Sequence, residues 1–151
     1  MKQKTIIQVW GKQGSGKSAT IKLIYHELFK RYIDPTHQYS FPLAGEISET
    51  LNCNGIKIGI ESLGDDLWYY GLNARLDNFI EIQNCDILIC ASRVHNNVAT
   101  HLKYLADTYG YRVLRATNYR GDELAFVHNN INLLSAQHII LVVDQIIAGT
   151  I

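Results

Sequence analysis

Cysteine is scarce in this sequence of 151 residues, which contains only Cys53, Cys85 and Cys90. Their number is odd and no two of them form a CxxC pair, which argues against both a disulfide framework and a structural zinc site. Such cysteine usage is typical of proteins in a reducing compartment. We therefore expect a cytoplasmic location.

The chain also lacks net charge, because fourteen Lys and Arg residues balance fourteen Asp and Glu residues. The net charge thus gives no indication that the protein binds nucleic acid or an anionic membrane. The N-terminal stretch passes from two lysines through a short apolar segment into glycines, so it lacks both the apolar region of a signal peptide and the length of a membrane span. No repeats or linkers interrupt the sequence, and we expect a single soluble domain over residues 1–151.

Apolar runs of strand length alternate with segments of helical period along the chain. Thr5–Trp10 predicts a buried parallel strand that stops at Gly11, and apolar residues at helical spacing predict a helix from about Lys17 to Tyr32. Such alternation indicates a three-layer α/β fold. The later elements expected in this series are a helix at 73–83, a strand at 85–91, a helix from Asn96 or Asn97 to Gly110, and a strand at 111–116.

A hairpin is predicted where Asn54-Gly55 separates two strands, at 46–53 and 56–61. The Asn-Gly pair suits a two-residue type I′ turn. The hairpin would add an antiparallel edge to an otherwise mostly parallel sheet.

The C-terminal segment Ile139–Val143 allows two interpretations. Its β-branched residues favour a strand, whereas Ser135 as an N-cap and Gly149 just past the end favour a helix. The distance between these two end signals suits a helix, so we predict one here.

A glycine-rich segment between the first strand and the first helix satisfies the pattern GxxxxGK[ST]. It comprises Gly11, Lys12, Gln13, Gly14, Ser15, Gly16, Lys17 and Ser18. Glycines let the backbone N–H groups face phosphate oxygens, and the dipole of the following helix adds to the attraction. We expect Lys17 to reach the β- and γ-phosphates and Ser18 to ligate Mg²⁺.

Over residues 5–32 the chain resembles the P-loop NTPase superfamily. The GxxGxGKS form of the loop is frequent among the members that use ATP. The resemblance implies a P-loop NTPase fold, with ATP as substrate or ligand and Mg²⁺ as cofactor.

A triphosphate site of this kind needs an acidic residue near Mg²⁺, at the end of a neighbouring strand. We predict that Glu61 has this role, because it ends a strand and a polar, glycine-containing loop follows it. With Gly64 three residues on, it resembles the Asp-x-x-Gly element of switch-type P-loop proteins, with Glu in place of Asp, which implies that the Gly64 N–H meets the γ-phosphate. Asp65 is a further candidate metal or water ligand, although Asp65 and Asp66 also suit a turn or a helix N-cap. Asp144, which follows the C-terminal apolar run, is the alternative to Glu61 for this role.

Two arginines follow predicted strands, and ligands bind beyond the carboxyl ends of strands in open α/β sheets. Arg93 and Arg120 are therefore candidates for stabilising charge on a transferring phosphoryl group, although an ordinary surface position is the preferred interpretation of each. Asn118 lies where guanine-specific proteins place their Asn-Lys-x-Asp motif, but the residues after it depart from that motif. Tyr119 is a candidate for stacking on a base or for packing.

An aromatic cluster, Trp68, Tyr69 and Tyr70, follows the acidic turn. Large aromatic side chains contribute most where they are buried. We predict that these three form a local core, with a surface for a substrate or partner as the alternative.

The residues favour Mg²⁺-dependent ATP hydrolysis that is slow without a protein partner, because no arginine is firmly placed to stabilise the transition state. A small-molecule or nucleotide kinase is the alternative, supported by the size of the chain and its GxxGxGKS loop. A second alternative is a non-catalytic nucleotide-binding protein within an assembly. In each case the ligand is a nucleoside triphosphate, and neither nucleic acid nor a membrane is indicated.

Overall fold

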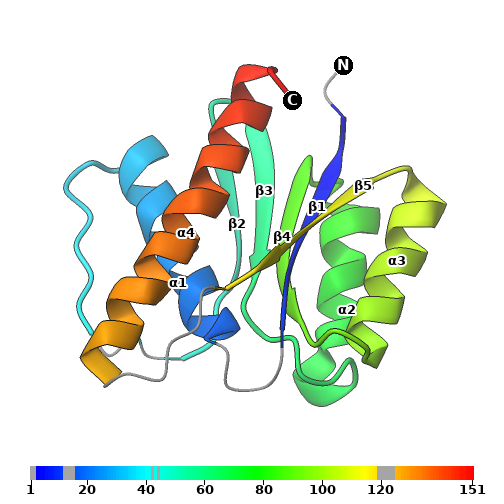
Figure 1. Cartoon of the computed structure of the whole chain (residues 1–151). Helices are drawn as coiled ribbons and strands as arrows, with labels where there is room; N and C mark the ends of the chain where they lie inside the picture. Colours follow the sequence, from blue (N-terminus) through cyan, green and yellow to red (C-terminus); the bar gives the residue numbers. More distant parts are fainter. Residues whose placement is uncertain (1–2, 12–15, 42, 44, 119–124) are drawn as a thin grey trace.

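A five-stranded sheet forms the centre of the fold in the computed structural model (Figure 1). The structure describes residues 3–11, 16–41, 43, 45–118 and 125–151, with the backbone alone described for 125–129. The strands are β1 (Thr5–Trp10), β2 (Ser48–Cys53), β3 (Ile56–Glu61), β4 (Ile87–Ser92) and β5 (Arg112–Thr117). Their spatial order is β2-β3-β4-β1-β5.

Helices cover both faces of this sheet, as Figure 1 shows. They are α1 (Lys17–Tyr32), the short η1 (Tyr69–Gly71), α2 (Leu72–Asp77) with its π-helical continuation η2 (Asn78–Ile82), α3 (Asn97–Tyr109) and α4 (Ala125–Ala148). The helices α1 and α4 lie on one face, and α2 and α3 lie on the other. The predicted α/β class and its three layers are confirmed.

The sheet is parallel except at one edge. β1 pairs in parallel with β4 and β5, and β4 pairs in parallel with β3. β2 runs antiparallel to β3. Between them Asn54 and Gly55 both have positive φ, 53° and 83°, as a type I′ turn requires. The predicted hairpin and antiparallel edge are confirmed, although β2 begins at Ser48, two residues later than expected.

The predicted bounds of α1 and the predicted end residues of α3 are confirmed. The helix α1 has the bounds expected from its apolar period. Asn96 caps α3, because its side-chain oxygen accepts a hydrogen bond from the Ala99 N–H at 3.0 Å. Gly110 closes α3 in the left-handed conformation, with φ 77°.

The C-terminal segment is a helix, which confirms the choice made for residues 139–143. Gly149 follows its end with φ 79°, as expected. The predicted N-terminus of this helix at Ser135 was wrong, because α4 begins at Ala125 and Ser135 lies buried within it. Burial against α1 and the sheet stabilises this helix, through a buried face that includes Ala136, Ile140 and Val143.

Within α4, the segment Asn130–Ala148 is long and apolar enough to cross a bilayer by length and composition. The core helix of a soluble protein meets the same criterion. In this fold one face of the segment belongs to the core shared with α1 and the sheet. That packing accounts for the apolar residues on this face, whereas Leu134 and Leu141 are exposed.

The two faces of the sheet have separate cores, because successive side chains of a strand point to opposite faces. In β4, Ile87 and Ile89 pack on the side of α1 and α4, whereas Leu88 and Cys90 pack on the side of α2 and α3. In β3, Ile58 and Ile60 also face α1 and α4. The next residue, Glu61, therefore faces α2.

A histidine pair joins α1 to the segment that follows it. The ring nitrogens His26 Nδ1 and His37 Nε2 lie 2.9 Å apart, and the ring of His26 stacks on Tyr39. Tyr39 in turn donates a hydrogen bond to Glu27 of α1. Burial, followed by the positive charge of His37, holds the pKa of His26 below its usual 6.5, while Glu27 acts in the opposite direction.

The free energy of unfolding should therefore fall as the pH drops below about 6.5. The lowered pKa means that the unfolded chain binds a proton at His26 more readily than the native state does, so the contribution is present above the unfolded pKa and is lost as the pH falls through the folded pKa. Urea unfolding at about pH 7.5 and about pH 5.5 measures the loss. In His26→Gln the loss should be smaller, and an unchanged loss would contradict this assignment.

Candidate functional site

A pocket of about 250 Å³ opens beside the N-terminus of α1. It lies where β3 and β4 end, and ligands in open α/β folds bind beyond the carboxyl ends of the strands. The residues that line it include the predicted site residues Gly16, Lys17, Ser18, Gly64 and Asp65, together with Glu46 and Ser62. The fold thus brings the end of the glycine-rich segment and the segment after β3 to one place.

The first turn of α1 is open to this pocket. Gly16 precedes the helix with φ 82°, and no side chain among the described residues caps the helix there. A Cβ at Gly16 would lie 2.5 Å from Asn132 Oδ1 of α4, so a larger residue would be strained by its positive φ and would also displace the Asn132 side chain. An uncapped helix N-terminus offers its N–H groups to an anion. The other loop residues Lys12, Gln13, Gly14 and Ser15 lie outside the described residues.

Lys17 is almost fully buried, with 6% of its surface exposed. Its Nζ donates a hydrogen bond to the carbonyl oxygen of Gly11 at 2.9 Å. Burial lowers the pKa of Lys17, the charge of Asp65 raises it, and the charge of Arg93 lowers it. An anion at this pocket would favour the charged form of the amine, because an opposite charge nearby offsets the cost of burial.

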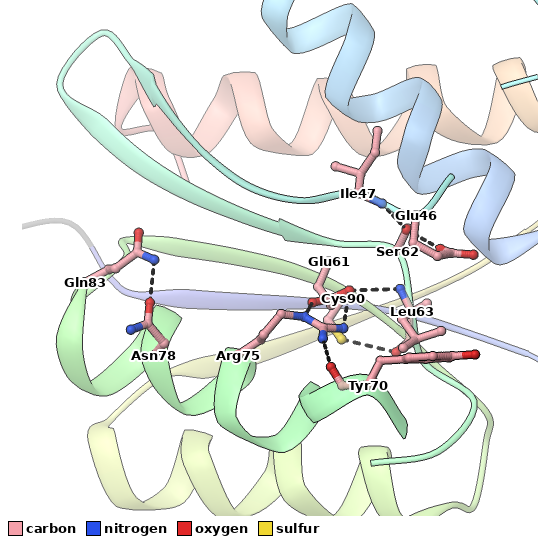
Figure 2. Close-up of polar contacts among 11 residues, drawn as sticks. Glu46, Ile47, Glu61, Ser62, Leu63, Tyr70, Arg75, Asn78, Gln83 and Cys90 are labelled. Atoms are coloured by element: carbon pink, nitrogen blue, oxygen red, sulfur yellow. Dashed lines mark hydrogen bonds and ion pairs between the residues drawn. The ribbon is translucent and has the colours of Figure 1, made fainter. Parts of the chain in front are cut away.

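Glu61 lies at the end of β3 but does not line the pocket. Its carboxylate is fully buried, and its Oε1 lies 2.8 Å from Nε of Arg75 on α2. Its Oε2 accepts a hydrogen bond from the Leu63 N–H at 3.1 Å (Figure 2). Arg75 also donates to the carbonyl oxygen of Tyr70. Holding a metal with Glu61 would require this ion pair to open.

Asp65 and Arg93 lie next to each other at the pocket. Arg93 Nε is 3.5 Å from Asp65 Oδ1, and both side chains are about half exposed. The Arg93 Nε is buried and has no hydrogen-bond partner among the described residues. Arg93 is therefore close enough to act on Lys17 and on an anion bound there. Arg120, the other predicted arginine, lies outside the described residues.

Two other acidic candidates have structural partners. Asp66 accepts hydrogen bonds from the Trp68 N–H and from the Asn97 side chain, each at 3.0 Å, which agrees with its alternative as a turn residue. Asp144 lies on α4 and pairs with Arg31 and Tyr32, at the C-terminal end of α1. Since α1 has 16 residues and rises 1.5 Å per residue, that end is about 24 Å from the pocket.

The aromatic cluster predicted as a local core is instead on the surface. Trp68, Tyr69 and Tyr70 are 70%, 59% and 84% exposed. The apolar residues that do fill this region come from α2 and the turn before it, with Leu67, Leu72 and Leu76 buried. The prediction was wrong because these leucines already occupy the space beneath the turn.

Asn118, the residue that follows β5, connects this strand to α1. The amide of Asn118 donates a hydrogen bond to Thr20 Oγ1 at 2.8 Å. The bond fixes the end of β5 against the first turns of α1. Its neighbour Tyr119 lies outside the described residues.

Sequence reasoning missed Glu46. Its Oε2 accepts a hydrogen bond from Ser18 Oγ at 3.0 Å and a second one from Ser62 Oγ. Ser62 Oγ in turn accepts from the Ile47 N–H at 2.7 Å, and Figure 2 shows the contacts of Ser62 with Ile47 and Glu46 beside the Glu61 ion pair. The sequence placed Glu46 at the start of a strand, and no motif marks it.

Comparison of the chain with protein-family models, with curated proteins and with solved structures gave no match. Within the described residues, no three His, Cys, Asp or Glu side chains gather into a metal-binding group. The residues at the pocket are therefore the basis for a functional assignment.

Proposed function

We propose that the chain is a P-loop nucleotide-binding protein that binds a nucleoside triphosphate, ATP by preference, in the pocket at the N-terminus of α1. The observation that carries the proposal is the position of Lys17 and Ser18, which both line a pocket at an uncapped helix N-terminus. Phosphate groups suit such a place, because the helix dipole, the N–H groups of the first turn and a lysine all favour negative charge. The GxxxxGKS pattern leads into the same helix.

The side chains at the pocket also suit Mg²⁺. They offer a hydroxyl from Ser18 and carboxylates from Glu46 and Asp65, and oxygen is the ligand type that Mg²⁺ prefers. Bound Mg²⁺ would offset negative charge on the phosphates. Lys17 would orient the phosphates and Ser18 would be one of the metal ligands.

The reaction we propose is slow hydrolysis of the bound triphosphate. Arg93 is the one arginine that the described structure places near Lys17, and it is about 40% exposed and paired with Asp65. An arginine that is this exposed and is already paired with a carboxylate is a weak stabiliser of a transition state. A partner protein or a movement of Arg93 would therefore be needed for fast turnover. If mass spectrometry after incubation with Mg-ATP and a metabolite pool finds the phosphate on a metabolite, the protein is a kinase instead.

Mg-ATP should raise the melting temperature of the wild-type protein, and Lys17→Ala should remove most of this increase. A ligand at about 100 times its Kd adds about 2.7 kcal/mol to the free energy of unfolding. For a domain of this size the increase corresponds to about 5–10 °C. Differential scanning fluorimetry with and without Mg-ATP measures it.

The matched control is Lys103→Ala, which removes an exposed lysine from α3, on the other face of the sheet. That variant should keep the full increase. A Lys17→Ala protein that is stabilised as much as wild type would overturn the phosphate site.

A further inference from the structure

We infer that Glu46, and not the strand-end Glu61, is the acidic residue that holds Mg²⁺ at the nucleotide pocket. The inference rests on the proposed function and names the metal ligand of that same site. Glu46 precedes β2 in the segment between α1 and the sheet. Its carboxylate lies beside the hydroxyl of Ser18, the expected metal ligand of the glycine-rich segment.

The distance between these two oxygens suits a shared Mg²⁺ ion. Mg²⁺ binds six oxygens octahedrally at 2.0–2.1 Å, so two adjacent ligands lie about 2.9 Å apart. Ser18 Oγ and Glu46 Oε2 are 3.0 Å apart. Both could therefore bind one ion with little movement, and the hydrogen bond between them holds that spacing when no ion is bound.

Ser62 orients the Glu46 carboxylate. The residue is 1% exposed, and its hydroxyl donates to Glu46 and accepts from the Ile47 N–H at 2.7 Å. Because Ser62 follows Glu61 at the end of β3, it lies on the side of α1, whereas Glu61 faces α2. The end of β3 thus takes part in the site through Ser62.

The other carboxylates near the pocket already have basic partners. Glu61 is paired with Arg75 inside the protein, and Asp65 is paired with Arg93. Glu46 forms no ion pair with any described residue, and its partners are the hydroxyls of Ser18 and Ser62. Among the described carboxylates that line the pocket, Glu46 is thus the one without a basic ion-pair partner, which favours it as the ligand of a cation.

The test measures how much Mg²⁺ tightens nucleotide binding. A fluorescent ATP analogue is titrated into wild type and Glu46→Gln, first with EDTA and then with excess Mg²⁺. In EDTA, Glu46→Gln should bind the nucleotide at least as tightly as wild type, because the Gln side chain keeps the shape of Glu46 and removes a negative charge that repels the phosphates. Mg²⁺ should tighten binding to wild type, and at least about tenfold of that gain should be lost in Glu46→Gln. Mn²⁺ in place of Mg²⁺ gives a second readout, since electron paramagnetic resonance reports how tightly the nucleotide complex holds the ion.

Three further variants make the result specific. Glu49→Gln removes the same charge from an exposed position on β2 and should keep the full Mg²⁺ effect. Glu46→Asp keeps the charge with a shorter reach and should recover part of the effect that Glu46→Gln loses. Glu61→Gln should keep the Mg²⁺ effect at temperatures where circular dichroism shows the variant folded.

The outcomes separate the two proposals. A wild-type protein that does not bind the nucleotide with or without Mg²⁺ would overturn the proposed function. Nucleotide binding that Mg²⁺ does not tighten, or a Mg²⁺ effect that survives in full in Glu46→Gln, would overturn the role of Glu46 alone, and loss of the effect in Glu61→Gln would assign the metal to Glu61 instead.

Discussion

Replacing Arg75 with methionine should lower the free energy of unfolding by about 3–5 kcal/mol. The Glu61 carboxylate is fully buried, and Arg75 is its ion-pair partner. Removing one partner of a buried pair leaves the other charge uncompensated, which costs about that much. For a domain of this size the melting temperature should fall by about 6–20 °C. Urea unfolding followed by circular dichroism measures the change.

The double variant Arg75→Met with Glu61→Leu should recover most of that loss, because apolar residues of similar volume often replace a buried ion pair at little cost. Lys103→Met is the surface control. Its pair with Asp107 is about two-thirds exposed on both sides, so the loss should stay below about 1 kcal/mol. If Arg75→Met costs no more than this control, Glu61 is not held as a buried charge.

Gly64→Ala should lower the free energy of unfolding by about 1–3 kcal/mol and weaken nucleotide binding. A Cβ at this position would lie 2.1 Å from the carbonyl oxygen of Ala91 and 2.3 Å from its carbon. Both are backbone atoms of β4, which is fixed between β3 and β1 and cannot move aside. The segment that carries Gly64 and Asp65 would therefore shift into or away from the pocket. Thermal unfolding and nucleotide titration measure the two effects.

Gly71→Ala separates this clash from the general cost of removing a glycine. Gly71 has φ 71°, and a Cβ there would meet nothing within 4 Å, so its variant carries backbone strain of about 1–2 kcal/mol without a clash. Nucleotide binding should be unchanged in Gly71→Ala. Equal binding by both alanine variants and wild type would show that the segment at Gly64 does not shape the site.

Much of the fold follows from local patterns. The bounds of α1 follow from its apolar period, and the hairpin follows from Asn54-Gly55. Asn96 and Gly110 mark the ends of α3 because a cap and a left-handed residue are needed wherever the helix lies. The N-terminus of α4 was misplaced because Ser135 has the chemistry of an N-cap but packs inside a longer helix.

The site was predicted less completely, for physical reasons. Lys17, Ser18, Gly64 and Asp65 were expected together and do line one pocket. The partner of Glu61 could not be predicted, because it depends on which face of the sheet α2 covers. β4 also lies between β3 and β1, so the strand that ends at Glu61 is not adjacent to the strand that leads into the glycine-rich segment.

Glu46 could not be found for a related reason. Its contact with Ser18 joins two residues that are 28 positions apart in the chain. The segment that carries it has no periodicity from which its course could be inferred. Only the packing of that segment against the end of β3, through Ser62, brings the carboxylate to the pocket.

The position of β1 inside the sheet, between β4 and β5, also bears on how the chain reaches its native state. Both neighbours of β1 come much later in the sequence, with Thr5 paired to Ile87 on one side and to Arg112 on the other. While a ribosome is still making the first half of the protein, this largely buried strand has no partner, and its apolar residues remain a target for chaperones and for aggregation. Contacts of such long range close slowly, so the rate of folding should be set by the arrival of β4 and β5. The proposed phosphate site, which begins where β1 ends, would then be one of the last parts of the molecule to form.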